Sequence, residues 1–411
     1  MRKIIIILLS VLIPILLISK EYTLDEAIEL GLKNSLDILA QEIQVENSKA
    51  NLHNTYLDLL PSLSVQSSKN NNDGEWNNIS ASLNISESVN WNDYRYFSIK
   101  KSLLNNKKTA LSLEDRKKEY VYNLFNKYIT IIETEKNNEI QIKNFDIQKK
   151  IFNQVRIKYE NGNESLLNFK QSKISLLESE INVEETKNRL ETLHKDFINF
   201  LNIEDKNIRL VEPQLSANFS VKQFKNNLQI KKNLFDIELT KFSLLEEKLN
   251  LYPNFSLGAS YGYANNYNTD FMELDNYDDS YSFSLSFSYA LFDLADKKLS
   301  YTNSKRNYRL QQLNFDNLVK ENRTDYEILI DNIETSQKTL KLYEQKLELA
   351  QENMQRAQEQ FQLGLIDLIN LEETKITLLN SELQYNQKYY DLIRKREELN
   401  LLLSEKILGK W

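Results

Sequence analysis

The sequence predicts a mainly α-helical protein made of two tandem repeats, each of which adds a pair of β-strands suited to a membrane. Three observations support this fold class. Glycine and proline are scarce, with seven and four among 411 residues. Landmarks of the first half of the chain recur in the second half. Four segments alternate large apolar residues with serine or another small residue.

The scarcity of glycine and proline predicts very long helices. These residues build most tight turns, and average proteins contain roughly 7% and 5% of them. Neither occurs between Gly74 and Gly162 or between Gly262 and Gly364. We therefore expect helices over 94–160 and 295–362, each about 100 Å long at about 1.5 Å per residue.

A helix is expected to return after each of the glycines at 162 and 364, over 165–203 and 366–405. The second returning segment has an apolar residue every three, four or seven positions, which favours an antiparallel coiled coil with the preceding helix. The apolar residues of this predicted seam are Leu365, Ile369, Ile376, Leu379, Leu383, Tyr390 and Ile393.

The chain is predicted to be a tandem duplication, with repeats over 21–212 and 213–411. Pro61 and Pro253 are 192 residues apart, whereas Gly162 and Gly364 are 202 residues apart. The offset grows by ten, so we expect a longer strand loop in the second repeat. A helical stretch ending at the proline opens each repeat, over 23–60 and 218–252. Chance similarity between low-complexity helices is the alternative, and the matched landmarks disfavour it.

The alternating segments predict two strands per repeat, over 62–70 and 78–90 and over 254–264 and 280–291. From Tyr281 to Tyr289 every odd residue is large and apolar and every even residue is serine. A period of two places all apolar side chains on one face. Apolar-faced strands of about 9–11 residues match transmembrane β-strands. A soluble β-sandwich is the alternative, but four strands in a helical chain are too few for one.

The surroundings of the strands also suit a membrane. Polar turns are expected at 70–74 and 265–279. Aromatic residues follow the second strand, where a girdle at the membrane boundary would lie. These residues are Trp91, Tyr94, Tyr96 and Phe97.

Four strands cannot close a barrel, and open sheet edges are not tolerated in hydrocarbon. We therefore expect the sheet to close with other copies of the chain. Three copies would give twelve strands and a lumen wide enough for water, whereas two would give a barrel too narrow for an open channel. The sequence thus requires an oligomer and favours a homotrimer.

Residues 1–20 are interpreted as a signal peptide. Met1-Arg2-Lys3 precedes an apolar stretch from Ile4 to Ile18. This stretch is shorter than the ~20 residues that a spanning helix needs. An N-terminal membrane anchor is the alternative interpretation.

Composition excludes several classes of function. The net charge of -7 argues against a nucleic-acid partner, and the absence of cysteine removes disulfides, thiolate catalysis and cysteine-bound metals. His53 and His194 lie in predicted helices without a ligand motif. No phosphate-binding glycine loop or nucleophile elbow occurs. We expect no enzyme, no cofactor and no metal site.

In their order and duplication these features resemble the TolC-like outer-membrane efflux protein family. The resemblance covers the chain after residue 20, and it includes Leu24-Asp25-Glu26-Ala27-Ile28, Asn34, Pro61, the strand pairs and the two glycine turns. It implies a homotrimer, with a 12-stranded β-barrel in the outer membrane and a long α-helical barrel crossing the periplasm. It also implies a passive duct that receives drugs, proteins or other cargo from an inner-membrane transporter through a periplasmic adaptor protein.

The resemblance further implies two sets of site residues. The turns at the periplasmic tip would dock the adaptor through Asn161, Gly162, Asn163, Leu363, Gly364 and Leu365. The aperture would be lined six and nine residues after each glycine, by Asn168, Gln171, Asn370 and Glu373. Asn370 departs from the aspartate common in the family, and Ile366 stands where a basic residue can occur. A ring of three Glu373 side chains is one interpretation, and a solvated helix face is the other.

Two functions follow. The first is the outer-membrane channel of a tripartite efflux or type I secretion system, gated at its periplasmic tip. The second is an exported coiled-coil structural or adhesive protein with a small outer-membrane anchor. The joint duplication of strands and helix pairs favours the channel. Ionic conductance across a bilayer separates the two.

Overall fold

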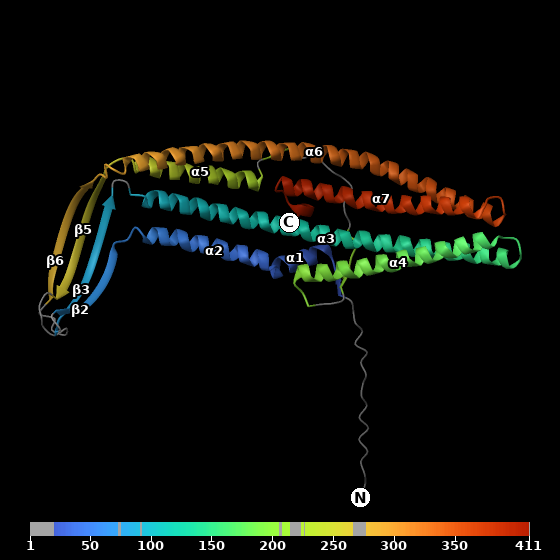
Figure 1. Ribbon diagram of the computed structural model, residues 1–411, viewed down its shortest axis with the longest axis horizontal. Coiled ribbons are helices and arrows are strands. Elements are labelled where there is room, and N and C mark those ends of the chain that lie inside the picture. Colours follow the sequence, from blue (N-terminus) through green and yellow to red (C-terminus); the bar gives the residue numbers. More distant parts are fainter. Residues whose placement is uncertain are drawn as a thin grey trace, which may run out of the picture.

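The computed structural model describes residues 20–72, 75–90, 93–204, 208–213, 223–225, 227–265 and 277–410. The molecule is elongated, with a β-sheet at one end and two helix turns at the other (Figure 1). Apart from Lys20, the predicted signal peptide lies outside the described residues, as do Trp91 and most of the predicted turn at 265–279. Among the described residues, no helix is both long and apolar enough to cross a membrane.

Both repeats contain a helix, a strand pair, a long helix and a returning helix in that order, and the first repeat has an additional short helix at its start. The helices of the first repeat are α1 (Leu24–Asn34), α2 (Leu36–Leu57), α3 (Arg95–Glu160) and α4 (Leu166–Leu201). Those of the second are α5 (Leu228–Leu249), α6 (Leu294–Gln362) and α7 (Leu368–Leu402). Figure 1 shows that α3 and α6 run from the sheet to the tip, with α2 and α5 beside their sheet-proximal halves and α4 and α7 beside their distal halves.

The first helix of each repeat differs from the prediction because a capping residue interrupts it. The helix expected over 23–60 is broken at Ser35, whose backbone is extended and whose Oγ accepts a hydrogen bond from Ile38 N at 3.3 Å. The helix expected over 218–252 begins only at Leu228, where Asn227 Oδ1 accepts from Ile230 N at 2.9 Å. Such side chains satisfy backbone donors that a helix start leaves unpaired.

The four main strands form one antiparallel sheet in the order β2-β3-β5-β6. Their bounds are Ser62–Asn72, Glu75–Asn90, Asn254–Asn265 and Tyr277–Ser288. The last strand was expected over 280–291 and instead ends three residues earlier. Strands β3 and β5 join the two repeats, so β2 and β6 are the edges of the sheet.

The two faces of the sheet differ in chemistry. One face is apolar and exposed: Val65 lies opposite Leu83, and Leu257 opposite Leu285. The other face carries serines, glycines and uncharged polar residues such as Asn84. Serine hydroxyls bond across the strands there, Ser62 to Ser86 at 2.7 Å and Ser260 to Ser282 at 2.8 Å, and a Cβ added to Gly258 would lie 2.6 Å from Ser284 Oγ.

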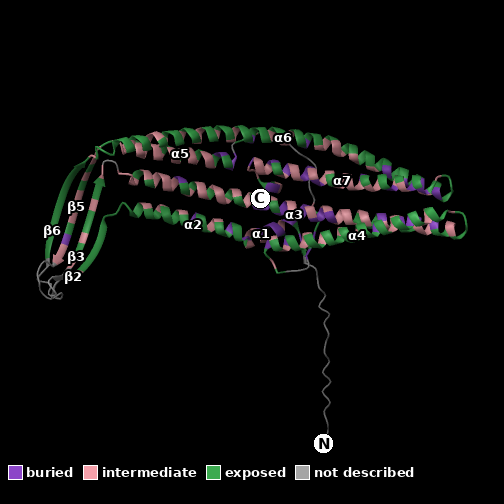
Figure 2. Cartoon of the chain, in the orientation of Figure 1, coloured by how far each residue is buried: buried purple, intermediate pink, exposed green. Residues whose placement is uncertain are grey.

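A small parallel sheet at the middle of the molecule has no counterpart in the prediction. Strand β1 (Lys20–Tyr22) pairs with β4 (Ile208–Leu210), and the hydroxyl of Tyr128 lies 3.0 Å from Tyr22 O. Beside it, burial raises the pKa of the Tyr120 hydroxyl to about 12. Strands of three residues are too short to leave a periodic signal in the sequence. Figure 2 shows buried residues gathered here and toward the tip.

The predicted coiled-coil seam of α7 is wrong at its tip end. Leu365, Ile369 and Ile376 are exposed in the chain, whereas Leu368 and Leu371 are buried one stripe further round the helix. The segment carries two apolar stripes, and spacing alone does not say which one faces the other helices of the same chain.

Candidate functional site

The first helix reversal at the tip is closed by two backbone hydrogen bonds. Gly162 N donates to Tyr159 O at 2.9 Å, and Asn163 N donates to Lys158 O at 2.8 Å. This pair of bonds is a Schellman motif, which needs a residue in the left-handed region. Gly162 provides it with φ 77°.

The second reversal has the same geometry 202 residues later. Gly364 N donates to Phe361 O at 3.1 Å, Leu365 N donates to Gln360 O at 2.8 Å, and Gly364 has φ 74°. The structure therefore brings all six predicted docking residues to one end of the molecule, in two matching turns (Figure 1). All six are exposed.

Replacing either glycine with alanine should cost about 1–2 kcal/mol, the penalty for a side chain in the left-handed region. No atom lies within 4 Å of a Cβ built on Gly162 or Gly364, so steric crowding adds nothing. Hydrogen exchange in the last turns of α3 and α6 should accelerate in the variants. Asn161→Ala is the matched control, since Asn161 has φ -87° and loses nothing on the backbone. Equal acceleration in the control would contradict the backbone explanation.

The returning helices begin at a side-chain cap that involves two of the predicted aperture residues. Asn168 N donates to Ser165 Oγ at 3.0 Å, and Asn370 N donates to Asp367 Oδ1 at 2.8 Å. The side chain of Asn168 also donates to Glu164, at 2.8 Å. The backbone of both asparagines therefore serves to start a helix.

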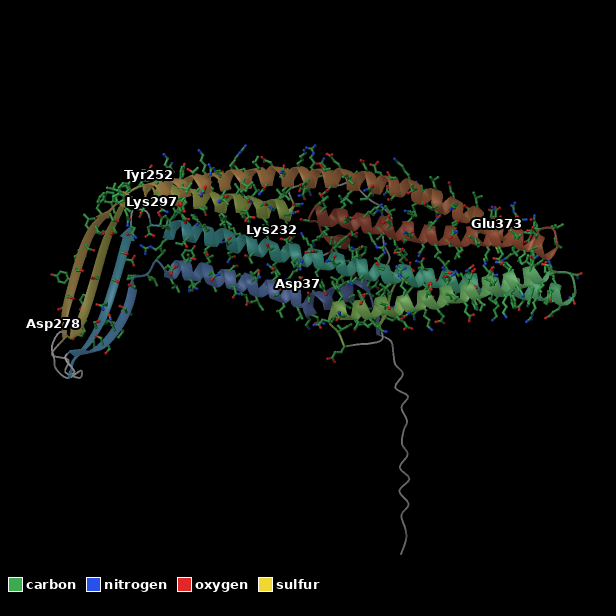
Figure 3. The ribbon with its side chains drawn as sticks, in the orientation of Figure 1. Asp37, Lys232, Tyr252, Asp278, Lys297 and Glu373 are labelled. Atoms are coloured by element: carbon green, nitrogen blue, oxygen red, sulfur yellow. The ribbon has the colours of Figure 1, made fainter. Side chains whose placement is uncertain are left out.

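Three of the four predicted aperture residues have exposed side chains. The side chains of Asn370 and Glu373 on α7 and of Gln171 on α4 are exposed in the chain. Glu373 lies close to the second turn (Figure 3). An exposed carboxylate here fits both a charged aperture and a solvated helix face.

An apolar core behind the turns joins the two helix pairs. Phe361 is buried on α6, and the ammonium of Lys158 on α3 lies 4.1 Å from its ring centroid and 3.2 Å from its carbonyl oxygen. Tyr159 stacks on Phe169 at 4.9 Å, and Ile366 packs against the core. Ile366 stands where a basic residue can occur in the family, and in this chain it is part of the apolar packing. The buried core residues are Ile151, Val155, Met354, Ala357, Phe361, Leu368 and Leu371.

A buried polar cluster lies next to this core, between α3 and α7. Lys375 Nζ is 2.7 Å from Glu372 Oε2, with side chains only 8% and 14% exposed. Gln148, fully buried on α3, donates to Glu372 Oε1 at 2.8 Å and accepts from Lys375. The sequence does contain a signal for it, since Lys375 follows Leu368 and Leu371 at heptad spacing. The prediction missed it because it chose the other stripe.

At the opposite end, Arg95 fastens the sheet to the helices. Its guanidinium donates to Glu87 at 2.7 Å, to Asp93 at 2.6 Å and to the carbonyl oxygen of Ser88 at 2.9 Å. A fourth bond, at 3.3 Å, reaches the carbonyl oxygen of Asp58 after α2. The hydrogen bond from Arg95 lowers the pKa of the Asp93 carboxyl. One side chain thus links β3, α2 and the start of α3.

The predicted aromatic girdle begins at this junction. Tyr96 is exposed in the first turn of α3 and lies edge-on to Phe97, at 5.5 Å. Tyr94 is partly buried, and its hydroxyl bonds to Asn250.

Neither histidine lies in a metal-binding group. His194 Nε2 is 3.6 Å from Glu135 Oε1, and no third ligand accompanies the pair. Across the described part of the chain, no cluster of three His, Asp or Glu side chains could hold a metal ion.

A known family model matches the second half of the chain. Residues 222–405 match the model described as outer membrane efflux protein. No curated protein sequence matches the chain.

Solved structures of outer-membrane channels share the fold over almost the whole chain. The outer-membrane channel OprN has a TM-score of 0.82 and 14% identity, and the match covers 93% of this chain and 90% of that one. VceC of Vibrio cholerae has a TM-score of 0.79 and 15% identity, with 94% and 96% covered. The CmeC channel of Campylobacter jejuni has a TM-score of 0.77 and 17% identity, with 94% and 87% covered.

These solved structures confirm the mainly helical fold with a small antiparallel sheet. The family match over residues 222–405 agrees with the predicted resemblance to outer-membrane efflux proteins.

Proposed function

We propose that this chain, whose residues 222–405 match the outer membrane efflux protein model, is a member of that family and the outer-membrane channel of a tripartite efflux or type I secretion system. Three copies close their sheets into a 12-stranded barrel and their helices into a tunnel through the periplasm. A periplasmic adaptor and an inner-membrane transporter supply energy and cargo. The protein itself is a passive duct and catalyses no reaction.

The observation that carries this proposal is the sheet. Phe283 and Leu285 stand exposed on one face, and serines cover the other. An exposed apolar patch of this kind requires a covering surface, and hydrocarbon provides one. The edges β2 and β6 cannot stay open there, so copies must pair. The serine face then lines a lumen that water can fill.

The tip is the proposed gate and docking surface. The turns around Gly162 and Gly364 lie about 100 Å from the sheet, because α3 spans 66 residues at about 1.5 Å each. Exposed Leu363 and Leu365 offer apolar contacts to an adaptor, and Glu373 from three copies forms a ring. Opening requires the two helix pairs of each copy to move apart at this end.

Ion conductance across a planar bilayer tests the function. The purified protein should conduct in discrete steps, whereas an anchored coiled-coil protein should not conduct. Phe283→Lys should abolish insertion, since a lysine on the lipid face costs about 2–4 kcal/mol at the midplane. Ser284→Lys, the next residue on the other face, is the matched control.

The control variant should still insert and should shift ion selectivity toward anions, because its charge lies in the lumen. Absence of conductance in inserted wild-type protein would overturn the channel proposal. Equal loss of insertion in both variants would contradict the assignment of the faces.

A further inference from the structure

Near the helices, the two β-hairpins of the chain have the same register. Ser62 lies opposite Ser86 in the first repeat and Asn254 opposite Ser288 in the second, and the match extends to Asn70 opposite Asn78 and Gly262 opposite Ser280. Beyond these pairs the first hairpin has a register irregularity between Asn70 and Asn72. Residues 254–262 of β5 thus correspond to the residues 192 positions earlier in β2, and residues 280–288 of β6 correspond to those 202 positions earlier in β3.

The pairing of β3 with β5 joins the two repeats, and we call it the seam. The duplication implies an equivalent seam that a single chain cannot form. Within the chain, β3 pairs with β5, with Val89 opposite Leu257 and Asn90 opposite Ser256. The corresponding seam would join β6 to β2, but these strands lie at opposite edges of the sheet. A second copy is the occupant that supplies the missing strand, since it carries the same edge in the same register.

Applying the two offsets gives this seam residue by residue. Val89 corresponds to Leu291, and Leu257 corresponds to Val65. Leu291 of one copy therefore falls opposite Val65 of the next. By the same rule Ser288 falls opposite Ser68, and odd residues meet odd residues, so the apolar face continues unbroken from copy to copy.

An independent observation supports this register. Strand β3 continues to Asn90, and the residue of the second repeat that corresponds to Asn90 is Phe292. Strand β6 nevertheless stops at Ser288, four residues before it. Residues 87–90 are held in β3 by β5 alone, because the pairing with β2 ends at Ser86. Residues 289–292 lack that partner within one chain. Leu291 and Phe292 are accordingly 70% and 100% exposed, and Val65 is 79% exposed.

The same two offsets, applied to the helices, bring no like charges together at the equivalent positions. Within the chain, α3 and α5 are joined by ion pairs, one of which links Lys232 with Asp115 at 2.5 Å. The others are Lys101 with Glu246 and Lys108 with Asp236. The corresponding seam would join α6 to α2 of the next copy. Its equivalent pairs are all uncharged: Asn317 with Ala40, Asn303 with Asn54, and Leu310 with Gln44.

We infer that neighbouring copies join edge to edge in this single register, with residues 289–292 completing β6 against Ser64–Ser67 of the next copy. The inference rests on the proposed function, because it assumes that copies close the sheet. It adds the residue pairs that make the closure.

Disulfide cross-linking tests the register, and the chain is suited to it because it has no cysteine. Leu291→Cys with Val65→Cys places both thiols in one chain at opposite edges, so a disulfide can form only between copies. Val89→Cys with Leu257→Cys is the matched positive control, since it is the same pair within the chain. Leu291→Cys with Leu63→Cys keeps the face and shifts the register by two residues.

A second variant, Ala290→Cys with Gln66→Cys, guards against unfavourable local geometry. Successive pairs alternate between wide and narrow Cα separations of about 5.5 and 4.5 Å, and disulfides accept both. On mild oxidation, the in-register variants should give covalent species of up to three chains that disappear on reduction. The shifted variant should give none.

Cross-linking of the shifted variant alone, in protein whose native mass corresponds to three copies, would overturn the register and leave the proposed function intact. A native mass of one copy across mild detergents would overturn both.

Discussion

Lys375→Met is expected to destabilise the tip by about 3 kcal/mol. The change removes the ammonium from a cluster in which Glu372 and Gln148 are buried, and it leaves the carboxylate without its counter-charge. Breaking a buried ion pair from one side costs about 3–5 kcal/mol, and the hydrogen bond from Gln148 keeps the cost at the lower end. The loss of stability can be measured by denaturant unfolding in detergent and by hydrogen exchange along α3 and α7.

Two comparisons isolate the buried charge. Arg356→Met removes a cation from α6 that is 73% exposed and 3.8 Å from Glu352, and it should cost at most about 0.5 kcal/mol. Adding Glu372→Gln to Lys375→Met should recover most of the lost stability, because no charge then stays buried. A double variant as unstable as the single one would assign the loss to packing.

Phe361→Ala is expected to cost about 3–5 kcal/mol, since it empties the apolar core that joins α3, α6 and α7 behind the turns. It also removes the ring beneath the ammonium of Lys158. Phe361→Leu keeps most of the volume and should lose far less. Thermal unfolding of the assembled protein, followed with tip-specific hydrogen exchange, measures the difference.

Both tip variants also test the gate. If the tip closes the duct, weakened packing there should raise single-channel conductance for Phe361→Ala and Lys375→Met, whereas Arg356→Met should match the unchanged protein. A loss of stability without any rise in conductance would place the constriction elsewhere.

The features that the sequence predicted well have strict periodicity or few competing residues. The alternation from Tyr281 to Tyr289 is consistent with only one orientation of the strand, and its apolar residues from Tyr281 to Phe287 do lie on one face. Gly162 and Gly364 stand alone in long segments, so the two reversals could be placed at single residues.

The features that escaped prediction depend on partners distant in sequence. Ser35 breaks a helix through one cap, which an apolar pattern does not record. Ile369 and Leu368 are adjacent in the sequence, and only the position of α3 and α6 decides that Leu368 is buried. The cluster around Lys375 needs Gln148, more than two hundred residues earlier.

The strand order also determines which strand pairs can form early in folding and which must form late. Hairpins such as β2–β3 join neighbouring residues and can form early, as can the helix pairs. Pairing of β3 with β5 must wait until most of the second repeat has been synthesised. The outer edges stay unpaired even then, and such edges invite aggregation. Productive closure therefore depends on the concentration of chains, and the yield of finished channel should depend on how many copies reach the membrane together.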